Sequence, residues 1–149
     1  MNSKTSLYIL FFLLGFLALG AIFGGGALVI SPSGELLYMP VSILGSSPFN
    51  DFLIPGIILL SILGILPAFI IFALLKKPKC KICESINFFS DMHWAWSFCI
   101  YIAFTLIIWI QIEMIFLNFV IWLHTFYMFY AIVLILVTLL PQIRNKYKK

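Results

Sequence analysis

Long apolar runs dominate this chain, and short clusters of polar residues separate them. Four of the runs are long enough to cross the hydrocarbon core of a bilayer, which takes roughly 20 helical residues. They lie at about Leu7–Ile30, Phe52–Leu75, Trp94–Glu113 and Leu117–Leu140. A helix satisfies its backbone hydrogen bonds internally, so it is the expected structure for such runs in lipid. The pattern predicts one all-α domain, residues 1–149, folded as a four-transmembrane-helix bundle with helices at about 7–30, 48–75, 92–113 and 117–140.

The connection between the first two runs, Ser31–Gly56, gathers serine, proline and glycine residues in one place. Its apolar part, Leu36–Leu44, is too short to span a membrane and contains Pro40, so we expect it to fold over one end of the bundle. Ser47 and Pro48 are typical of an N-cap and a first helical position, which predicts that the second helix begins there. We expect an outward-facing cap, whose candidate partner-binding residues are Pro32, Ser33, Gly34, Met39, Pro40, Ser47, Pro48 and Phe49.

Charged residues are few and unevenly placed, which gives the helices a direction. Only 9% of the residues are charged, against about 25% in a soluble domain, so a soluble fold is excluded. Basic residues occur at the N-terminus, in Lys76–Lys81 and in Arg144–Lys149, and the first and third connections have none. The positive-inside rule therefore predicts a multi-pass plasma-membrane protein with both termini in the cytoplasm. The net charge of +4 reports topology, and nucleic-acid binding is not expected.

Glycine and proline mark where the helices are expected to approach one another or to bend. Gly20 and Gly24 form a small-xxx-small pair in the first run, a spacing that lets another helix approach closely. The alternative is that they are ordinary glycines of a membrane helix. Pro55 and Pro67 are expected to kink the second helix, because proline removes a backbone hydrogen bond and clashes with the preceding turn.

Cys80 and Cys83 form the sharpest local motif, Cys-Lys-Ile-Cys, in the second connection. Neighbouring lysines can lower the pKa of a thiol and make such a pair redox-active, but the predicted side is cytoplasmic and reducing. A zinc site completed by His93 and Cys99 is another alternative, although Cys99 lies within the third helix. We expect ordinary reduced thiols, with no metal and no cofactor.

Glu113 and His124 are ionisable residues expected at similar depth in the third and fourth helices. An ionisable side chain within a membrane is costly and is therefore a functional hypothesis. Gln111 lies two positions from Glu113, so it faces another side of the helix. Together with Asp51, at the start of the second helix, these residues form a candidate polar site. The alternative is that Glu113 marks the end of its helix and only reaches headgroup water.

The cap sequence Ser31–Gly56, the stretch WIQIEM (Trp109–Met114) and the stretch WLHTFY (Trp122–Tyr127) together resemble one protein family. This family consists of small, uncharacterised prokaryotic four-helix membrane proteins. Its pattern is a glycine-rich first helix, a PSG…L.MP.S.L..SPF.DFLIPG stretch and a polar residue near the end of the third helix. The resemblance covers most of the chain and implies the fold and topology, but it carries no activity.

The sequence contains no nucleophile–base pair, phosphate-binding glycine loop or acid pair at a defined spacing, so an enzyme is not the favoured class. The first hypothesis is an integral membrane protein that binds a protein partner, lipid or a second copy of itself through the cap. The second is a small-molecule or proton-handling membrane protein that uses Asp51, Glu113 and His124. The third is a cytoplasm-facing thiol or metal protein that uses Cys80 and Cys83.

Overall fold

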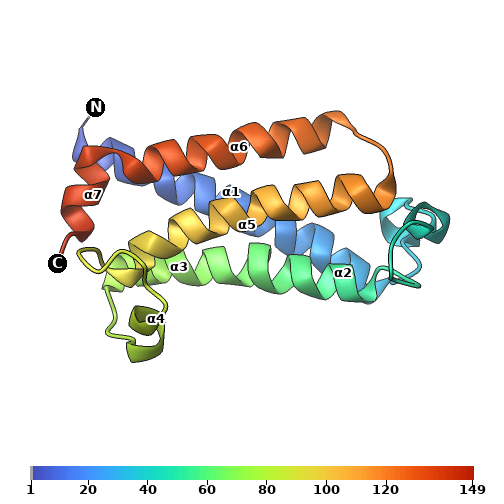
Figure 1. The fold of residues 1–149 in the computed structure, drawn as a ribbon, viewed down its shortest axis with the longest axis horizontal. Helices are drawn as coiled ribbons and strands as arrows, with labels where there is room; N and C mark the ends of the chain where they lie inside the picture. Colours follow the sequence, from blue (N-terminus) through green and yellow to red (C-terminus); the bar gives the residue numbers. More distant parts are fainter. Residues whose placement is uncertain (1) are drawn as a thin grey trace.

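The computed structural model describes residues 2–149 and is an all-helical bundle (Figure 1). Four helices in it are long and apolar enough to cross a membrane, namely Ser3–Ile30, Leu53–Lys76, Trp94–Leu117 and Trp122–Leu139. The first, third and fourth are α1, α5 and α6, and the second consists of α2 (Leu53–Ile58), η3 (Leu59–Ile65) and α3 (Leu66–Lys76). The predicted four-helix bundle is confirmed.

The shorter elements gather at the two ends of the bundle (Figure 1). One end carries η1 (Glu35–Leu37), η2 (Val41–Leu44) and the connection from α5 to α6. We call residues 31–52 the cap and this end the cap end. The other end carries α4 (Lys81–Ser85), α7 (Pro141–Tyr147) and the C-terminus, beside the start of α1. We call it the terminal end.

The boundary between the third and fourth helices differs from the predicted one. α5 continues one turn past Glu113 to Leu117, and α6 begins only at Trp122. Asn118 ends α5 in the left-handed conformation, with φ of 56°, and its N–H donates to the Met114 carbonyl oxygen at 3.1 Å. Asparagine tolerates this conformation better than most residues, which makes it a suitable helix terminator. Glu113 is therefore one turn inside its helix.

The main core lies between α1, α3, α5 and α6, and its largest buried side chains are at the terminal end. Trp94 and Trp96 are fully buried there, together with Tyr147 of α7. The indole N–H of Trp96 donates to the Thr138 carbonyl oxygen at 2.9 Å, which satisfies its polar atom within the core. Dense packing at this end contrasts with the cap end, where the structure leaves hollow space.

The cap packs onto the ends of α1 and α5, as the hydrophobicity of Leu36–Leu44 predicts. Leu44 and Phe52 are buried beside Leu28 of α1. Packed against these three are Leu37, Met39, Val41, Ile43 and Leu117. The chain enters the cap through a turn at Gly34, with φ of +77°, where a Cβ atom would overlap the Met39 carbonyl oxygen. The cap is therefore a built part of the bundle.

The second membrane helix begins later than the Ser47–Pro48 signal predicts. Its first helical residue is Leu53, and Asp51 accepts a hydrogen bond from the Leu53 N–H at 2.9 Å. Tertiary contacts outweigh the local signal. The Phe52 N–H donates to the Pro32 carbonyl oxygen, and Phe52 is buried between the cap and α1. Ser47 instead accepts the Phe49 N–H within a local turn.

The close approach of α1 to the second membrane helix involves Gly25 and not the predicted Gly20–Gly24 pair. A Cβ atom on Gly25 would lie 2.6 Å from the Leu60 backbone nitrogen and 2.9 Å from the Gly56 carbonyl oxygen. Around Gly20 and Gly24 the nearest atoms to such a Cβ are ends of side chains, at 3.2 and 3.8 Å. The small-residue spacing is thus present in α1, but the contact falls one residue further on.

A π-helical segment, η3, interrupts the second membrane helix directly before Leu66 and Pro67. Proline has no backbone N–H and clashes with the carbonyl four residues earlier. A wider turn before Pro67 accommodates both effects. π-Helical turns often occur at functional sites, and Leu59 and Leu63 of η3 line a cavity at the cap end.

Candidate functional site

A cavity of about 440 Å³ lies under the cap, between α1, η3, α5 and α6. Its wall is mostly apolar, and its polar side-chain groups are the Glu113 carboxyl, the His124 imidazole, the Trp109 indole and the hydroxyls of Tyr38 and Tyr127. The lining residues are Leu17, Gly20, Ala21, Tyr38, Met39, Pro40, Ile43, Leu59, Leu63, Leu106, Trp109, Ile110, Glu113, Leu117, Phe119, Ile121, Leu123, His124 and Tyr127. An apolar hollow with a few polar groups is typical of a small-molecule binding site.

Glu113 of α5 and His124 of α6 face one another across the cavity wall. The Nε2 atom of His124 lies 4.0 Å from the Oε2 atom of Glu113. The His124 side chain is 5% exposed and the Glu113 side chain 32% exposed. The structure therefore brings the two side chains together, and the alternative in which Glu113 only reaches headgroup water stays a prediction. The pair forms because the four-residue α5–α6 connection turns the two helices antiparallel, so residues before and after it meet.

The hydrogen bond at the start of α6 determines which nitrogen of His124 carries the proton. The Ile121 N–H donates to Nδ1 of His124 at 3.2 Å. A nitrogen that accepts a hydrogen bond carries no proton, so the imidazole is the neutral tautomer with its proton on Nε2. His124 therefore directs an N–H donor toward the carboxyl oxygen of Glu113. The 4.0 Å separation is too long for a direct hydrogen bond between them.

The cavity has a polar end and an apolar end. Glu113 lies in the last turns of α5, close to the cap, whereas Leu106 lies seven residues deeper along the same helix. At 1.5 Å per residue, this places Leu106 roughly 10 Å further from the cap. Leu17 of α1 and Leu63 of η3 line the wall with Leu106. The polar pair thus lies near the cap end of the bundle, and the apolar wall extends toward the middle of the four long helices.

A second cavity of about 250 Å³ lies on the other side of Glu113, below the cap. It is lined by Leu28, Met39, Leu44, Phe49, Phe52, Pro55, Ile58, Trp109, Ile112, Glu113, Phe116 and Leu117. Met39, Trp109, Glu113 and Leu117 line both cavities. Glu113 is therefore positioned between two apolar hollows.

Asp51 and Gln111, the other members of the predicted polar site, do not line either cavity. Asp51 accepts the Leu53 N–H and so serves the start of α2. Gln111 is exposed, and its Nε2 atom lies 3.9 Å from the sulfur of Met128. Of the four predicted residues, the structure brings together only Glu113 and His124. Trp109 and Tyr127 also line the cavity, four residues before Glu113 and three residues after His124. The fourfold spacing places Trp109 on the same helix face as Glu113, whereas Tyr127 was not among the predicted site residues.

The predicted cap surface separates into two groups. Met39 and Pro40 line the main cavity, and Phe49 lines the second one. Pro32 and Gly34 shape the turn that leads into the cap, since the Pro32 carbonyl accepts from Phe52 and the Gly34 carbonyl accepts from Met39. Ser33 and Pro48 are exposed. The cap therefore contributes walls to the cavities as well as an outer surface.

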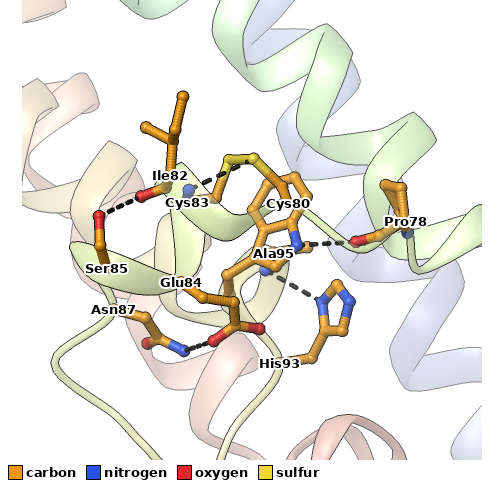
Figure 2. The surroundings of a disulfide bond; sticks show 10 residues. Pro78, Cys80, Ile82, Cys83, Glu84, Ser85, Asn87, His93 and Ala95 are labelled. Carbon is orange, nitrogen blue, oxygen red and sulfur yellow. Dashed lines mark hydrogen bonds between the residues drawn. A yellow bond between two sulfur atoms is a disulfide. The ribbon is translucent and has the colours of Figure 1, made fainter.

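At the terminal end, Cys80 and Cys83 are joined by a disulfide, which corrects the expectation of two separate thiols (Figure 2). Cys80 is the N-cap residue of α4, and Cys83 lies three residues later in that short helix. This spacing brings the two Cα atoms to 5.3 Å, within the range of disulfides. Among residues 2–149, no three His, Cys, Asp or Glu side chains could together hold a metal ion, so the zinc alternative gains no support.

His93 and Glu84 lie near the disulfide but have other partners (Figure 2). The Nδ1 atom of His93 accepts the Ala95 N–H at 3.2 Å, which caps the start of α5. Partial burial lowers the pKa of His93. Desolvation raises the pKa of Glu84, but hydrogen bonds from Lys149 and Asn87 and the charge of Lys149 outweigh it and hold that pKa below its usual value.

No protein-family model, curated protein or solved structure matches this chain. The family resemblance of the cap sequence remains a hypothesis.

Proposed function

We propose that this protein is an integral membrane protein that binds an amphipathic, lipid-like molecule in the cavity at the cap end. The observation that carries the proposal is the graded polarity of that cavity, with Glu113 and His124 near the cap and Leu17, Leu63 and Leu106 deeper in the bundle. Its volume of about 440 Å³ lies in the range of small-molecule sites, roughly 300–1,000 Å³. An amphipathic molecule in a bilayer has the same polarity gradient.

The polar pair favours a hydroxyl as the head of this molecule. His124 offers an N–H donor and Glu113 offers an acceptor oxygen, 4.0 Å apart. One oxygen atom can lie within hydrogen-bond distance of both, about 2.8 Å, without moving either side chain. A hydroxyl group both accepts and donates, so it can bridge the two groups. We therefore propose a long-chain alcohol as the ligand class.

The proposed orientation places the cap outside and the terminal end in the cytoplasm of a plasma-membrane protein. The basic residues of the chain support it, because Lys76, Lys77, Arg144 and Lys146 are at the terminal end and the cap contains none. In this orientation the cavity lies in the outer half of the bundle, beside the cap. A protein partner or a second copy of the chain on the outer face of the cap is the alternative function, for which exposed Leu36 and Tyr38 are the supporting observation.

The test is binding of 9,10-dibromostearyl alcohol to the purified protein in nanodiscs, measured by bromine quenching of tryptophan fluorescence. Trp109 lines the cavity and reports its occupancy. The methyl ether of the same alcohol is the matched probe, since it keeps the chain but cannot donate a hydrogen bond. Glu113→Met should weaken alcohol binding about tenfold, equivalent to 1.4 kcal/mol, and should leave ether binding unchanged. Gln111→Met, which lies outside the cavity, is the control.

A second pair of variants tests the cavity itself. Gly20 lines the cavity, and a side chain there would point toward the Tyr127 hydroxyl, whereas a Cβ atom on Gly26 meets nothing within 4 Å. Gly20→Leu should abolish the quenching by the alcohol, and Gly26→Leu should retain it. Equal affinity for the alcohol and the ether, or full binding by Gly20→Leu, would contradict the proposal.

A further inference from the structure

The proposed function does not use the Cys80–Cys83 disulfide in the connection between α3 and α5 (Figure 2). Both cysteines are half-buried, and the two residues between them, Lys81 and Ile82, are exposed. Ile82 is 78% exposed. The pair therefore packs against the main core and is still partly exposed, beside two exposed residues of the connection between α3 and α5.

This disulfide does not cross-link two elements of the fold. It joins residues three apart within one connection, and a closed loop this short gains less stability from cross-linking than a long one. Other interactions hold the connection in place. They are hydrogen bonds from Trp94 Nε1 to the Pro78 carbonyl at 2.9 Å, from Asn87 Nδ2 to the Met92 carbonyl at 2.8 Å and from Ser97 Oγ to Asn87 Oδ1 at 2.6 Å. The disulfide can therefore open without loss of the surrounding structure.

The surroundings of Cys80 favour its thiolate form over that of Cys83. The Sγ atom of Cys80 accepts a hydrogen bond from the Cys83 N–H at 3.3 Å. Exposed Lys79 and Lys81 flank Cys80 directly in the sequence, and neighbouring positive charge stabilises a thiolate. Cys99 is fully buried and donates to the Ala95 carbonyl oxygen, so it cannot meet an outside thiol.

We propose that Cys80 and Cys83 form a redox-active pair that exchanges with dithiols at the membrane surface. A thiolate of the partner dithiol attacks Sγ of Cys80, forms a mixed disulfide and releases Cys83 as a thiolate. The second partner thiolate then attacks the mixed disulfide and releases Cys80. The partner is oxidised to a disulfide, and the pair takes up the two electrons and two protons that the partner loses. The reverse reaction begins with attack by the Cys80 thiolate.

The proposed orientation gives a further reason to expect that Cys80 and Cys83 are redox-active. It places the terminal end in the cytoplasm, where persistent structural disulfides are rare and those that form are transient, catalytic or redox-sensing. A disulfide on that side is therefore expected to cycle. This reason rests on the orientation, whereas the arguments from access, from the short loop and from the lysines stand without it.

The first experiment is a redox titration of the full-length protein in detergent, in mixtures of reduced and oxidised dithiothreitol. Trapping with N-ethylmaleimide and intact-mass measurement count the free thiols. Cys80 and Cys83 should open and close together and reversibly, while Cys99 stays unmodified and the thermal midpoint does not change. A parallel arm replaces dithiothreitol by a reduced dithiol peptide. Exchange in either arm supports the proposal and identifies the source of the dithiol, and exchange in neither overturns it.

The matched variants Cys83→Ser and Cys80→Ser test the assigned roles. Each leaves one thiol of the pair, and its rate of mixed-disulfide formation with oxidised glutathione is measured by intact mass. Cys83→Ser, which retains Cys80, should react at least tenfold faster than Cys80→Ser at neutral pH. Equal rates would overturn the role of Cys80. A wild-type pair that fails to close again after reduction, or a lowered thermal midpoint on reduction, would indicate a structural disulfide and overturn the proposal.

Discussion

Gly25 shows how a single missing side chain sets the distance between two helices. The atoms that a Cβ on Gly25 would meet belong to the backbone of Gly56 and Leu60 in the second membrane helix. Backbone atoms cannot rotate away as the end of a side chain can, so the helices would have to separate. Lipid tails offer no hydrophobic driving force to hold membrane helices together, and close van der Waals packing supplies much of their attraction. Gly25 therefore contributes directly to the stability of the bundle.

Gly25→Ala is expected to destabilise the protein by about 1–3 kcal/mol, the usual cost of overpacking. Gly26→Ala is the matched control, because a Cβ there meets nothing within 4 Å and alanine is the better helix former. The measurement is the thermal midpoint of both variants in the same detergent, followed by circular dichroism. If the two variants melt at the same temperature, the close packing at Gly25 does not stabilise the bundle.

At the scale of elements, hydrogen bonds and an ion pair connect α7 and the C-terminal residues to the segment between α3 and α5. The Tyr147 hydroxyl donates to the Leu74 carbonyl oxygen at 3.0 Å, and the Tyr147 carbonyl accepts the His93 N–H at 2.8 Å. Burial raises the pKa of Tyr147 to about 12, so it remains a donor at neutral pH. The Lys149 Nζ atom completes this arrangement, 2.7 Å from Oε2 of Glu84. From the sequence, this segment shows only as a basic tail, because these bonds depend on which backbone atoms lie nearby.

The Glu84–Lys149 pair predicts a specific pH dependence. The folded pKa of Glu84 is below its unfolded value of about 4.5, so the pair stabilises the protein above that pH, and this contribution is lost as the pH falls through the folded pKa. Because Glu84 is one third exposed, the contribution is about 0.2–1 kcal/mol. Glu84→Gln should lower the thermal midpoint slightly at pH 7 and leave it equal to that of the wild type at pH 3. Glu35→Gln, exposed at the cap end, is the control. A difference for Glu84→Gln that persists at pH 3 would show that its charge is not the cause.

Much of the whole molecule can be predicted from the sequence. The features that could not be predicted have one physical cause in common. The run lengths alone predict the four membrane helices, and the short α5–α6 connection predicts their antiparallel pairing. These helices are apolar on every face, so the sequence does not show which face turns inward. For this reason the contact between Glu113 and His124 and the shift from Gly20–Gly24 to Gly25 needed the structure, whereas the two-residue spacing already separated Gln111 from Glu113. Local signals also yielded to tertiary contacts, as at Ser47–Pro48, where the burial of Phe52 delays the helix start.

The uneven distribution of basic residues between the two ends predicts the orientation of the whole molecule in the membrane. The cap has no basic residue, whereas the terminal end carries nearly all of them, so the cap is expected outside and the terminal end in the cytoplasm. Ser46→Cys and Ser85→Cys place one exposed thiol at each end, each in a background with Cys80→Ser and Cys83→Ser so that neither native thiol of the pair reacts.

On intact cells, a membrane-impermeant maleimide should label Ser46→Cys, and it should label Ser85→Cys only after the membrane is permeabilised. The background without either added cysteine is the control, because Cys99 is fully buried and should stay unlabelled throughout. The opposite pattern would overturn the orientation and place the Cys80–Cys83 disulfide in an oxidising space, where structural disulfides also form and persist. Labelling of intact cells therefore decides the topology and, with it, whether the compartment argument for the redox pair holds.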